Sequence, residues 1–224
     1  MTPPETGPEL LVLAPLGIEA GALRRGLAAE SEISTVVLRT GMGPRRSAQS
    51  LRRVRESPAR VLVVAGLCGA VSPDLGPGQV LVASELRGPA GCTALASASS
   101  LLASLAREGV PARAVPIASV ERAVHGRGRE RMAREGVAAV DMESAWLHAA
   151  AGTRPFAVLR VVADAPGHEW LRLGIALDAL RALRALTRSA RALQRWACTA
   201  LQRVPSNLEG SAIHRSTTLV GRGA

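Results

Sequence analysis

Short apolar segments rich in β-branched residues alternate with longer segments of helical composition through most of this 224-residue chain. The predicted strands are residues 10–14, 35–38, 61–65, 79–83, 113–117 and 157–162, and the predicted helices are residues 18–27, 45–55, 95–108, 130–135, 144–151 and 173–203. Strands that alternate with helices are typical of α/β proteins with a largely parallel sheet covered on both faces. We therefore expect an α/β fold with a single domain, built on a mixed, largely parallel central sheet flanked by helices.

The chain shows no internal repeat and no interior linker, so we expect one domain over residues 10–204. Residues 1–9 lack a basic segment followed by an apolar one and are expected to be a flexible lead rather than a secretory signal. Residues 205–224 are polar and rich in Gly and Ser, which favours a disordered tail. The longest apolar runs, such as residues 61–71, are far shorter than the roughly 18 residues of a membrane helix, so no transmembrane segment is expected.

The formal charge is +10, and all 28 basic residues are arginine. A helical projection puts five of them on one face of the last helix: Arg181, Arg184, Arg188, Arg191 and Arg195. Such a face can bind nucleic-acid phosphates, or it can simply be solvated while its long stems cover apolar surface. Because aromatic residues make up only 2% of the chain, few are available to stack on bases, and no nucleic-acid partner is expected.

The three cysteines, Cys68, Cys92 and Cys198, are widely spaced and form no Cys-x-x-Cys pair. This pattern indicates neither a disulfide framework nor a zinc site. We therefore expect a cytoplasmic protein that holds no metal.

Two motifs follow the first two predicted strands, at the sheet edge where open α/β sheets bind ligands. Glu19 begins a helix directly after the first strand, where a carboxylate is either a functional group or a partner of the helix dipole. Gly41 and Gly43 form a Gly-rich turn whose backbone N–H groups can approach an anion or a sugar. Neither a dinucleotide fingerprint nor a phosphate-binding loop with lysine is present.

Two further motifs follow later apolar strands. Gly66 and Leu67 belong to a glycine-containing segment, residues 65–70, for which we expect a tight turn with close backbone approach. Residues 140–145 include Met142 and Glu143 at a strand end, and Asp164 closes the apolar strand that follows. Because an acid is costly to bury there, Asp164 is expected to keep its proton and to act as a general acid.

Taken in order, these motifs resemble the purine nucleoside phosphorylase and nucleosidase superfamily, particularly its methylthioadenosine/S-adenosylhomocysteine nucleosidase branch, over most of residues 10–165. The resemblance implies that Glu19 positions the attacking water and that Met142 and Glu143 hold the ribose. It also implies that Asp164 donates a proton toward N7 of the purine. The turns at Gly41, Gly43 and Gly66 would flank the sugar and the nucleophile.

Several positions depart from the pattern of the family. Leu67 replaces a common Ser, and Val64 replaces the Arg of phosphorolytic members, which favours water over phosphate as the nucleophile. Phosphorolysis stays open at this stage because Arg39, Arg45 and Arg46 lie beside the Gly41–Gly43 turn and are possible phosphate-binding residues; phosphate would then be a co-substrate, and no other cofactor is expected.

The expected purine pocket also differs from that of the family. Where members stack the base on an aromatic ring, this chain offers Val120 or His125. Asp141 is expected to be a structural or supporting acid. Ala163 replaces a Ser that usually precedes the general acid, so Asp164 lacks that partner.

The motifs are most similar to those of the hopanoid-associated nucleoside phosphorylase group, which implies release of adenine from adenosylhopane in hopanoid biosynthesis. Methylthioadenosine, S-adenosylhomocysteine, 5′-deoxyadenosine and futalosine remain alternative substrates. The resemblance also implies a homo-oligomer. A nucleoside-binding protein without turnover and a basic nucleic-acid-binding protein are the alternatives of a different class.

Overall fold

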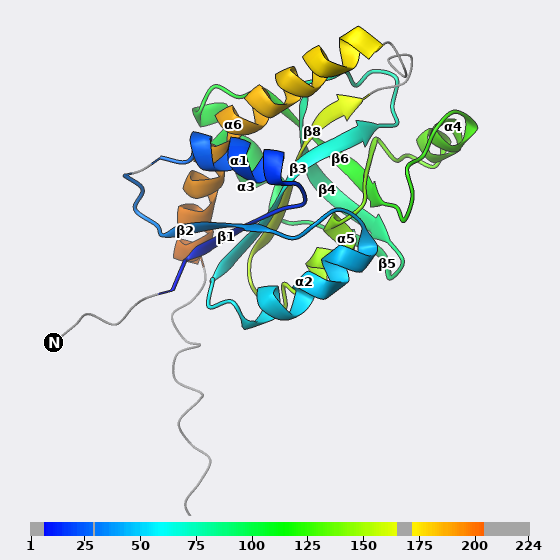
Figure 1. Ribbon diagram of the computed structural model, residues 1–224. Coiled ribbons are helices and arrows are strands. Elements are labelled where there is room, and N and C mark those ends of the chain that lie inside the picture. Colours follow the sequence, from blue (N-terminus) through cyan, green and yellow to red (C-terminus); the bar gives the residue numbers. More distant parts are fainter. Residues whose placement is uncertain (1–6, 29, 165–171, 204–224) are drawn as a thin grey trace, which may run out of the picture.

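The computed structural model describes residues 7–28, 30–164 and 172–203. Its strands are β1 (Leu10–Ala14), β2 (Thr35–Arg39), β3 (Val61–Ala70), β4 (Val80–Gly88), β5 (Gly91–Ala94), β6 (Ala112–Ser119), β7 (Ala139–Asp141) and β8 (Phe156–Asp164). Its helices are α1 (Gly17–Gly26), α2 (Pro44–Glu56), α3 (Ala98–Arg107), α4 (Arg127–Arg134), α5 (Ser144–His148) and α6 (Arg172–Arg203) (Figure 1). The expected tail at 205–224 and residues 1–6 of the expected lead lie outside the described residues.

All eight strands belong to one sheet, with the order β2-β1-β3-β7-β6-β4-β5. Strand β8 pairs with both β3 and β4, so β3, β7, β6, β4 and β8 form a closed ring. The β1–β3, β3–β8 and β4–β6 pairs are parallel, whereas the β3–β7 and β4–β8 pairs are antiparallel. The expected mixed, largely parallel sheet is confirmed, and its closure is a feature that the strand pattern did not predict.

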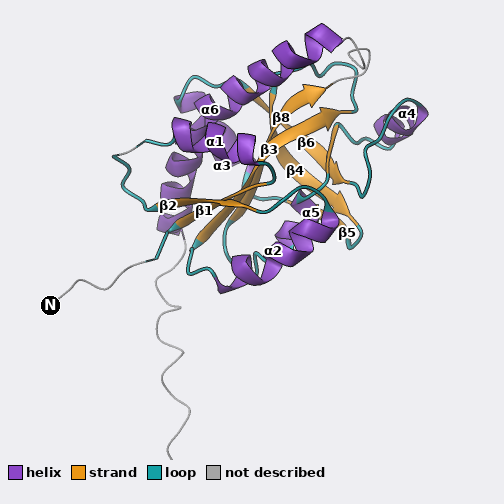
Figure 2. Ribbon diagram, viewed as in Figure 1, coloured by secondary structure: helices purple, strands orange, loops and turns teal. Residues whose placement is uncertain are grey.

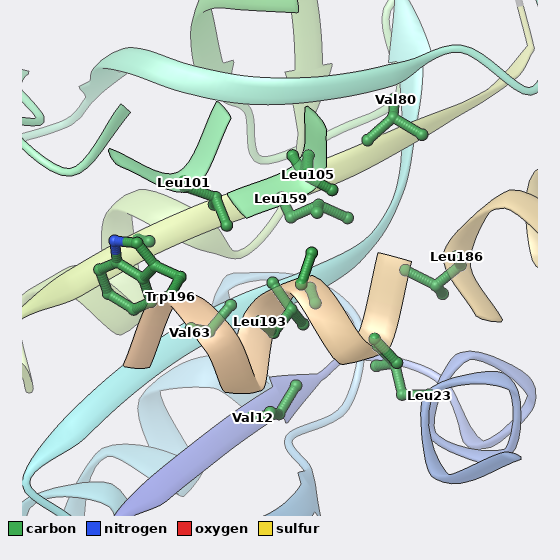
Figure 3. Packing of buried hydrophobic residues seen from close by; sticks show 14 of the residues in the cluster. Val12, Leu23, Val63, Val80, Leu101, Leu105, Leu159, Leu186, Leu193 and Trp196 are labelled. Atoms are coloured by element: carbon green, nitrogen blue, oxygen red, sulfur yellow. The ribbon is translucent and has the colours of Figure 1, made fainter. Parts of the chain in front are cut away.

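Helices cover the sheet on two sides (Figure 2). Helix α6 packs against α1, α3 and β8, and α2 packs against α5. In Figure 3, Leu193 of α6 lies near Val63 and Leu159, and Trp196 of the same helix lies near Leu101. The five arginines of the predicted stripe are exposed on the outer side of α6. The amphipathic pattern of this helix therefore serves to bury its apolar face against the sheet and the neighbouring helices.

Strand β3 is longer than predicted, and the tight turn expected over residues 65–70 is wrong. The strand continues through Ala70, because residues 62–69 stay paired with β8 and the last two residues also pair with β7. The glycines in this segment therefore allow neighbouring side chains to lie close to the backbone of β3, and they do not reverse the direction of the chain. Strand β5 was not predicted, because four exposed residues give too short a pattern to recognise, whereas β7 ends at Asp141, next to the strand end that was expected for Met142 and Glu143.

Candidate active site

A cavity of about 210 Å³ lies where residues after β1 and β2 meet the ends of β3, β7 and β8. Six of the predicted site residues line it: Glu19, Leu67, Val120, Met142, Glu143 and Asp164. A larger hollow, of about 1060 Å³, lies between α6 and the starts of β4 and β6 and contains none of the predicted site residues. The chemistry-bearing motifs thus meet at the smaller cavity, although they come from distant parts of the chain.

Glu19 is held from both sides by backbone N–H groups. One carboxylate oxygen accepts from Leu16 at 2.6 Å, at the start of α1, and the other accepts from Leu67 at 2.7 Å, on β3. The side chain is buried, and burial raises the pKa of Glu19, although Arg160 and the two N–H groups oppose this rise. Because each carboxylate oxygen can accept two hydrogen bonds, Glu19 can also orient a water molecule in the cavity.

Gly66 makes room for the Glu19 carboxylate. A Cβ at this position would lie 2.8 Å from Oε1 of Glu19 and 2.9 Å from Nη1 of Arg160. Both distances are shorter than a normal contact, so any larger residue would displace one of the two side chains. Gly66 was predicted to flank the nucleophile, but it does not line the cavity itself. In the structure it gives space to the Glu19 carboxylate.

Glu143 is buried and is tied to the Gly-rich turn after β2. Its Oε1 accepts from the backbone N–H of Gly43 at 3.0 Å, and its Oε2 accepts from Nη2 of Arg160 at 3.2 Å. Gly43 has φ +88°, in the left-handed region that favours glycine. Burial raises the pKa of Glu143, while the charge of Arg160 lowers it. Gly41 and Gly43 do not line the cavity; through Gly43, the turn positions Glu143 instead.

Arg160 is a buried arginine to which the sequence analysis assigned no role. Its Nε donates to Asp141 at 2.9 Å, Nη2 donates to Glu143 at 3.2 Å and to Ser144 Oγ at 2.9 Å, and Nη1 donates to the Leu67 carbonyl at 3.3 Å. The carboxylates of Asp141 and Glu143 raise the pKa of Arg160 against the opposing effect of burial. An arginine inside the apolar strand 157–162 was a signal that could have found it, since an isolated charge there would be costly.

Asp141 has the supporting role that was expected for it. Its Oδ1 accepts from Ser119 Oγ at 2.6 Å and from the backbone N–H groups of Glu143 and Ser144 at 3.2 Å each. The carboxylate is buried and neutralises part of the Arg160 charge. Asp141 thus fixes the turn that carries Glu143, rather than presenting a free carboxylate to the cavity.

Asp164 lies beside Gly69 because β8 contains an irregularity. Cys68 pairs with Val162 and Gly69 pairs with Asp164, so Ala163 is an extra residue in β8. Such an insertion redirects the side chains that follow it. The expectation that Asp164 is buried is wrong, since its side chain is 49% exposed and forms an ion pair with Arg129. The burial on which the sequence argument for Asp164 depended is therefore absent from the structure.

Arg129 was missed by the sequence analysis because it lies in a strongly polar helix, α4, whose charges resemble a solvated face. Its side chain is only 5% exposed. Nε donates to the Val124 carbonyl at 2.8 Å, and Nη2 donates to Asp164. Ala163 has no polar side chain that could bind Asp164. In the structure Arg129 is the residue that donates a hydrogen bond to Asp164.

The remaining predicted residues fall into two groups. His125 lines the cavity beside Val120, and none of the described lining residues is Phe or Trp. By contrast, Arg39, Arg45 and Arg46 are exposed and do not line the cavity. The structure therefore does not bring the candidate phosphate-binding arginines to the site.

Within the described ranges, no cluster of three or more His, Cys, Asp or Glu side chains is arranged to hold a metal ion. Across the same ranges, no helix combines the length and the apolarity that a membrane-spanning segment needs.

Comparisons with known proteins agree with the motif order. A model of the phosphorylase superfamily matches residues 14–195. The structure resembles that of the 5′-methylthioadenosine/S-adenosylhomocysteine nucleosidase from Helicobacter pylori, with a TM-score of 0.66 and 15% identity over 89% of this chain and 100% of that chain.

Two further solved structures are similar. The futalosine hydrolase of Helicobacter pylori has a TM-score of 0.66 and 15% identity, covering 87% of this chain and 97% of that chain. The methylthioadenosine/S-adenosylhomocysteine nucleosidase from S. pneumoniae has a TM-score of 0.67 and 20% identity, covering 86% of this chain and 99% of that chain. None of the curated proteins matches the chain.

Proposed function

The chain belongs to the phosphorylase superfamily, and on this premise we propose that it cleaves the N-glycosidic bond of a 5′-modified purine nucleoside and releases adenine. The observation that carries the proposal is the cavity into which Glu19, Met142, Glu143 and Asp164 all extend. The similar structures are of proteins named as nucleosidases and as a futalosine hydrolase, which supports the same class of reaction.

The ribose end of the cavity suits a positively charged transition state. Breaking an N-glycosidic bond builds positive charge on the sugar, as in other glycoside hydrolysis. Glu143, fixed by Gly43 and Arg160, would bind the ribose hydroxyls, and Met142 would lie against the sugar. Glu19 would orient the attacking water and accept its proton. The raised pKa of Glu19 makes its carboxylate a better proton acceptor near neutral pH.

Asp164 would act at the other end, on the departing base. A purine leaves poorly unless it gains a proton, and general acid catalysis is typically worth about 10² to 10⁴ in rate. In the proposed reaction Asp164 gives a proton to N7 as the bond between C1′ and N9 breaks. Val120 would contact the base.

Water is favoured over phosphate as the nucleophile. The charge of Arg160 acts on Glu19, but the donors of this guanidinium already bind Asp141, Glu143, Ser144 and the Leu67 carbonyl. A phosphate would need donors that are not already used in this way. The exposed position of Arg39, Arg45 and Arg46 leaves them outside the cavity, which supports hydrolysis.

The 5′ substituent is proposed to be apolar, as in adenosylhopane. Pro15, Leu16 and Met42 line the cavity next to the turn that holds Glu143. The Met42 side chain is also 51% exposed, so an apolar wall continues from the cavity to the surface. Methylthioadenosine, S-adenosylhomocysteine and futalosine are the alternatives.

The test is base release from a panel of nucleosides, with and without phosphate. We expect adenine from a nucleoside with an apolar 5′ group, at a rate that does not depend on phosphate. Replacing Arg39, Arg45 and Arg46 together by Gln should leave that rate unchanged, because none of them lines the cavity. A rate that rises in proportion to phosphate would show phosphorolysis instead, and no base release from any nucleoside would leave a binding protein.

We also propose that the protein is a cytoplasmic homo-oligomer. The free thiols of Cys68, Cys92 and Cys198 are compatible with a reducing compartment. Light scattering of the purified protein would give its mass in solution. The mass of a monomer at the concentration of the activity assay would contradict the proposed homo-oligomer.

A further inference from the structure

Arg129 is held at two points beside the cavity. Its Nε donates to the Val124 carbonyl at 2.8 Å, and its Nη2 donates to Asp164. Among the described residues that line the cavity, Arg129 is the only arginine. Since the side chain is almost fully buried, its orientation is set by these neighbours rather than by solvent.

The charges of the cavity differ between its two ends. The first end lies beside Gly66, where Glu19 is in close contact, and the second lies beside Gly69, where Asp164 and Nη2 of Arg129 come within 2.9 and 3.4 Å of the position of a Cβ. Three residues of extended strand separate the two glycines by about 10 Å. The ribose end therefore holds the carboxylates of Glu19 and Glu143 with Arg160 next to them, and the base end holds the carboxylate of Asp164 paired with the guanidinium of Arg129.

This arrangement matches the movement of charge in the proposed reaction. As the glycosidic bond breaks, the sugar becomes positive and the electron pair moves to the purine. Fixed charges that face developing charges of opposite sign lower the barrier without reorganising. A positive group at the base end would therefore assist departure of the base.

We propose that Arg129 is a second residue of the leaving-group end, which stabilises the negative charge that arrives there. This inference rests on the proposed function. The C1′–N9 electron pair goes to the purine, the proton of Asp164 goes to N7, and the carboxylate that remains on Asp164 pairs with Arg129. Water adds its oxygen to C1′ and gives its proton to Glu19. In this scheme the contact between Arg129 and Asp164 holds the charge that proton transfer leaves on the carboxylate.

A purely structural role for Arg129 makes a different prediction. If Arg129 only fixes α4 to the end of β8, its removal would disturb every substrate equally. If it stabilises the departing base, its removal would matter for a purine and not for a leaving group that departs without a proton. A para-nitrophenolate is such a group, and para-nitrophenyl β-ribofuranoside is the probe.

The experiment compares Arg129→Met, Arg129→Lys and wild type on a purine nucleoside and on the nitrophenyl riboside. Arg131→Met is the matched control, because Arg131 lies on the same helix with a side chain that is 74% exposed. We expect Arg129→Met to lose about 10²-fold in kcat on the purine nucleoside and less than about threefold on the nitrophenyl riboside. Arg129→Lys should recover about tenfold of the loss, because it keeps the charge without the planar fork.

Equal losses on both substrates, or no loss on the purine nucleoside, would overturn the proposal. If wild type cleaves the purine nucleoside but not the nitrophenyl riboside, the kcat values of Arg129→Lys and Arg129→Met on the purine nucleoside are compared, and equal values would overturn the proposal. A wild-type enzyme that releases no base from any nucleoside would overturn the proposed function and this inference together. An active wild type with indifferent Arg129 variants would overturn this inference alone.

Discussion

The backbone N–H of Leu67 donates to the carboxylate of Glu19 at 2.7 Å, although the two residues are 48 positions apart. The contact joins the first turn of α1 to strand β3. It also gives Leu67 a role that does not depend on its side chain.

Gly66→Ala should abolish base release. The new Cβ would lie 2.8 Å from Oε1 of Glu19 and 2.9 Å from Nη1 of Arg160, and neither group can move without losing its hydrogen bonds. Gly76→Ala is the matched control, because a Cβ there meets nothing within 4 Å. Turnover of both variants on one nucleoside checks the prediction, and normal activity of Gly66→Ala would contradict it.

Asp164→Asn should reduce base release by about 10²-fold or more, because Asn has no proton of suitable acidity to give to N7. The fold should survive, since the side chain is half-exposed. Asp74→Asn removes a carboxylate from an exposed pair with Arg113, neither of which lines the cavity, and should leave turnover unchanged. Retained turnover in Asp164→Asn would remove this residue from the mechanism.

Arg160→Met should destabilise the protein by about 3–5 kcal/mol, because it leaves the buried carboxylates of Asp141 and Glu143 without their cation. Arg52→Met breaks a largely exposed pair with Glu56 on the surface of α2 and should change stability by less than about 1 kcal/mol. Urea unfolding of both variants measures the difference. Similar midpoints for the two variants would show that the Arg160 network contributes little.

Glu19 should make both activity and stability depend on pH. Burial raises its pKa above the ordinary value of 4.5, so the water-orienting carboxylate should be lost on acidification at a pH above that value. The sign for stability is opposite. The folded state keeps the proton that the unfolded chain releases near pH 4.5, so the contribution of Glu19 is full below that pH and declines as pH rises through the folded pKa.

The free energies of unfolding of wild type and Glu19→Gln, measured in urea across the acidic to neutral range, check this sign. The free energy of unfolding of wild type minus that of Glu19→Gln should fall as pH rises. Glu143, whose pKa is also raised by burial, is present in both proteins, so the subtraction removes its contribution to the pH dependence. A difference that rises with pH would mean that the hydrogen bonds from Leu16 and Leu67 outweigh burial.

The amino-acid sequence alone determined the strands and helices that have strong periodic patterns, the order of the motifs and six of the residues that line the cavity. Segments 10–14 and 35–38 match β1 and β2 closely, and Glu19, Met142, Glu143 and Asp164 do meet in one cavity. These features were accessible because apolar periodicity and local turn chemistry are properties of neighbouring residues.

Only the tertiary structure decided how charges pair across the chain. The closure of the sheet through β8, the extension of β3 past Gly66, and the Arg160 and Arg129 contacts all depend on residues far apart in sequence. Local pattern carries no information on which carboxylate an arginine meets, since Arg129 in a polar helix and Arg160 in an apolar strand look like opposite cases. Packing placed both beside the cavity, and with them the balance of charge on which the proposed chemistry depends.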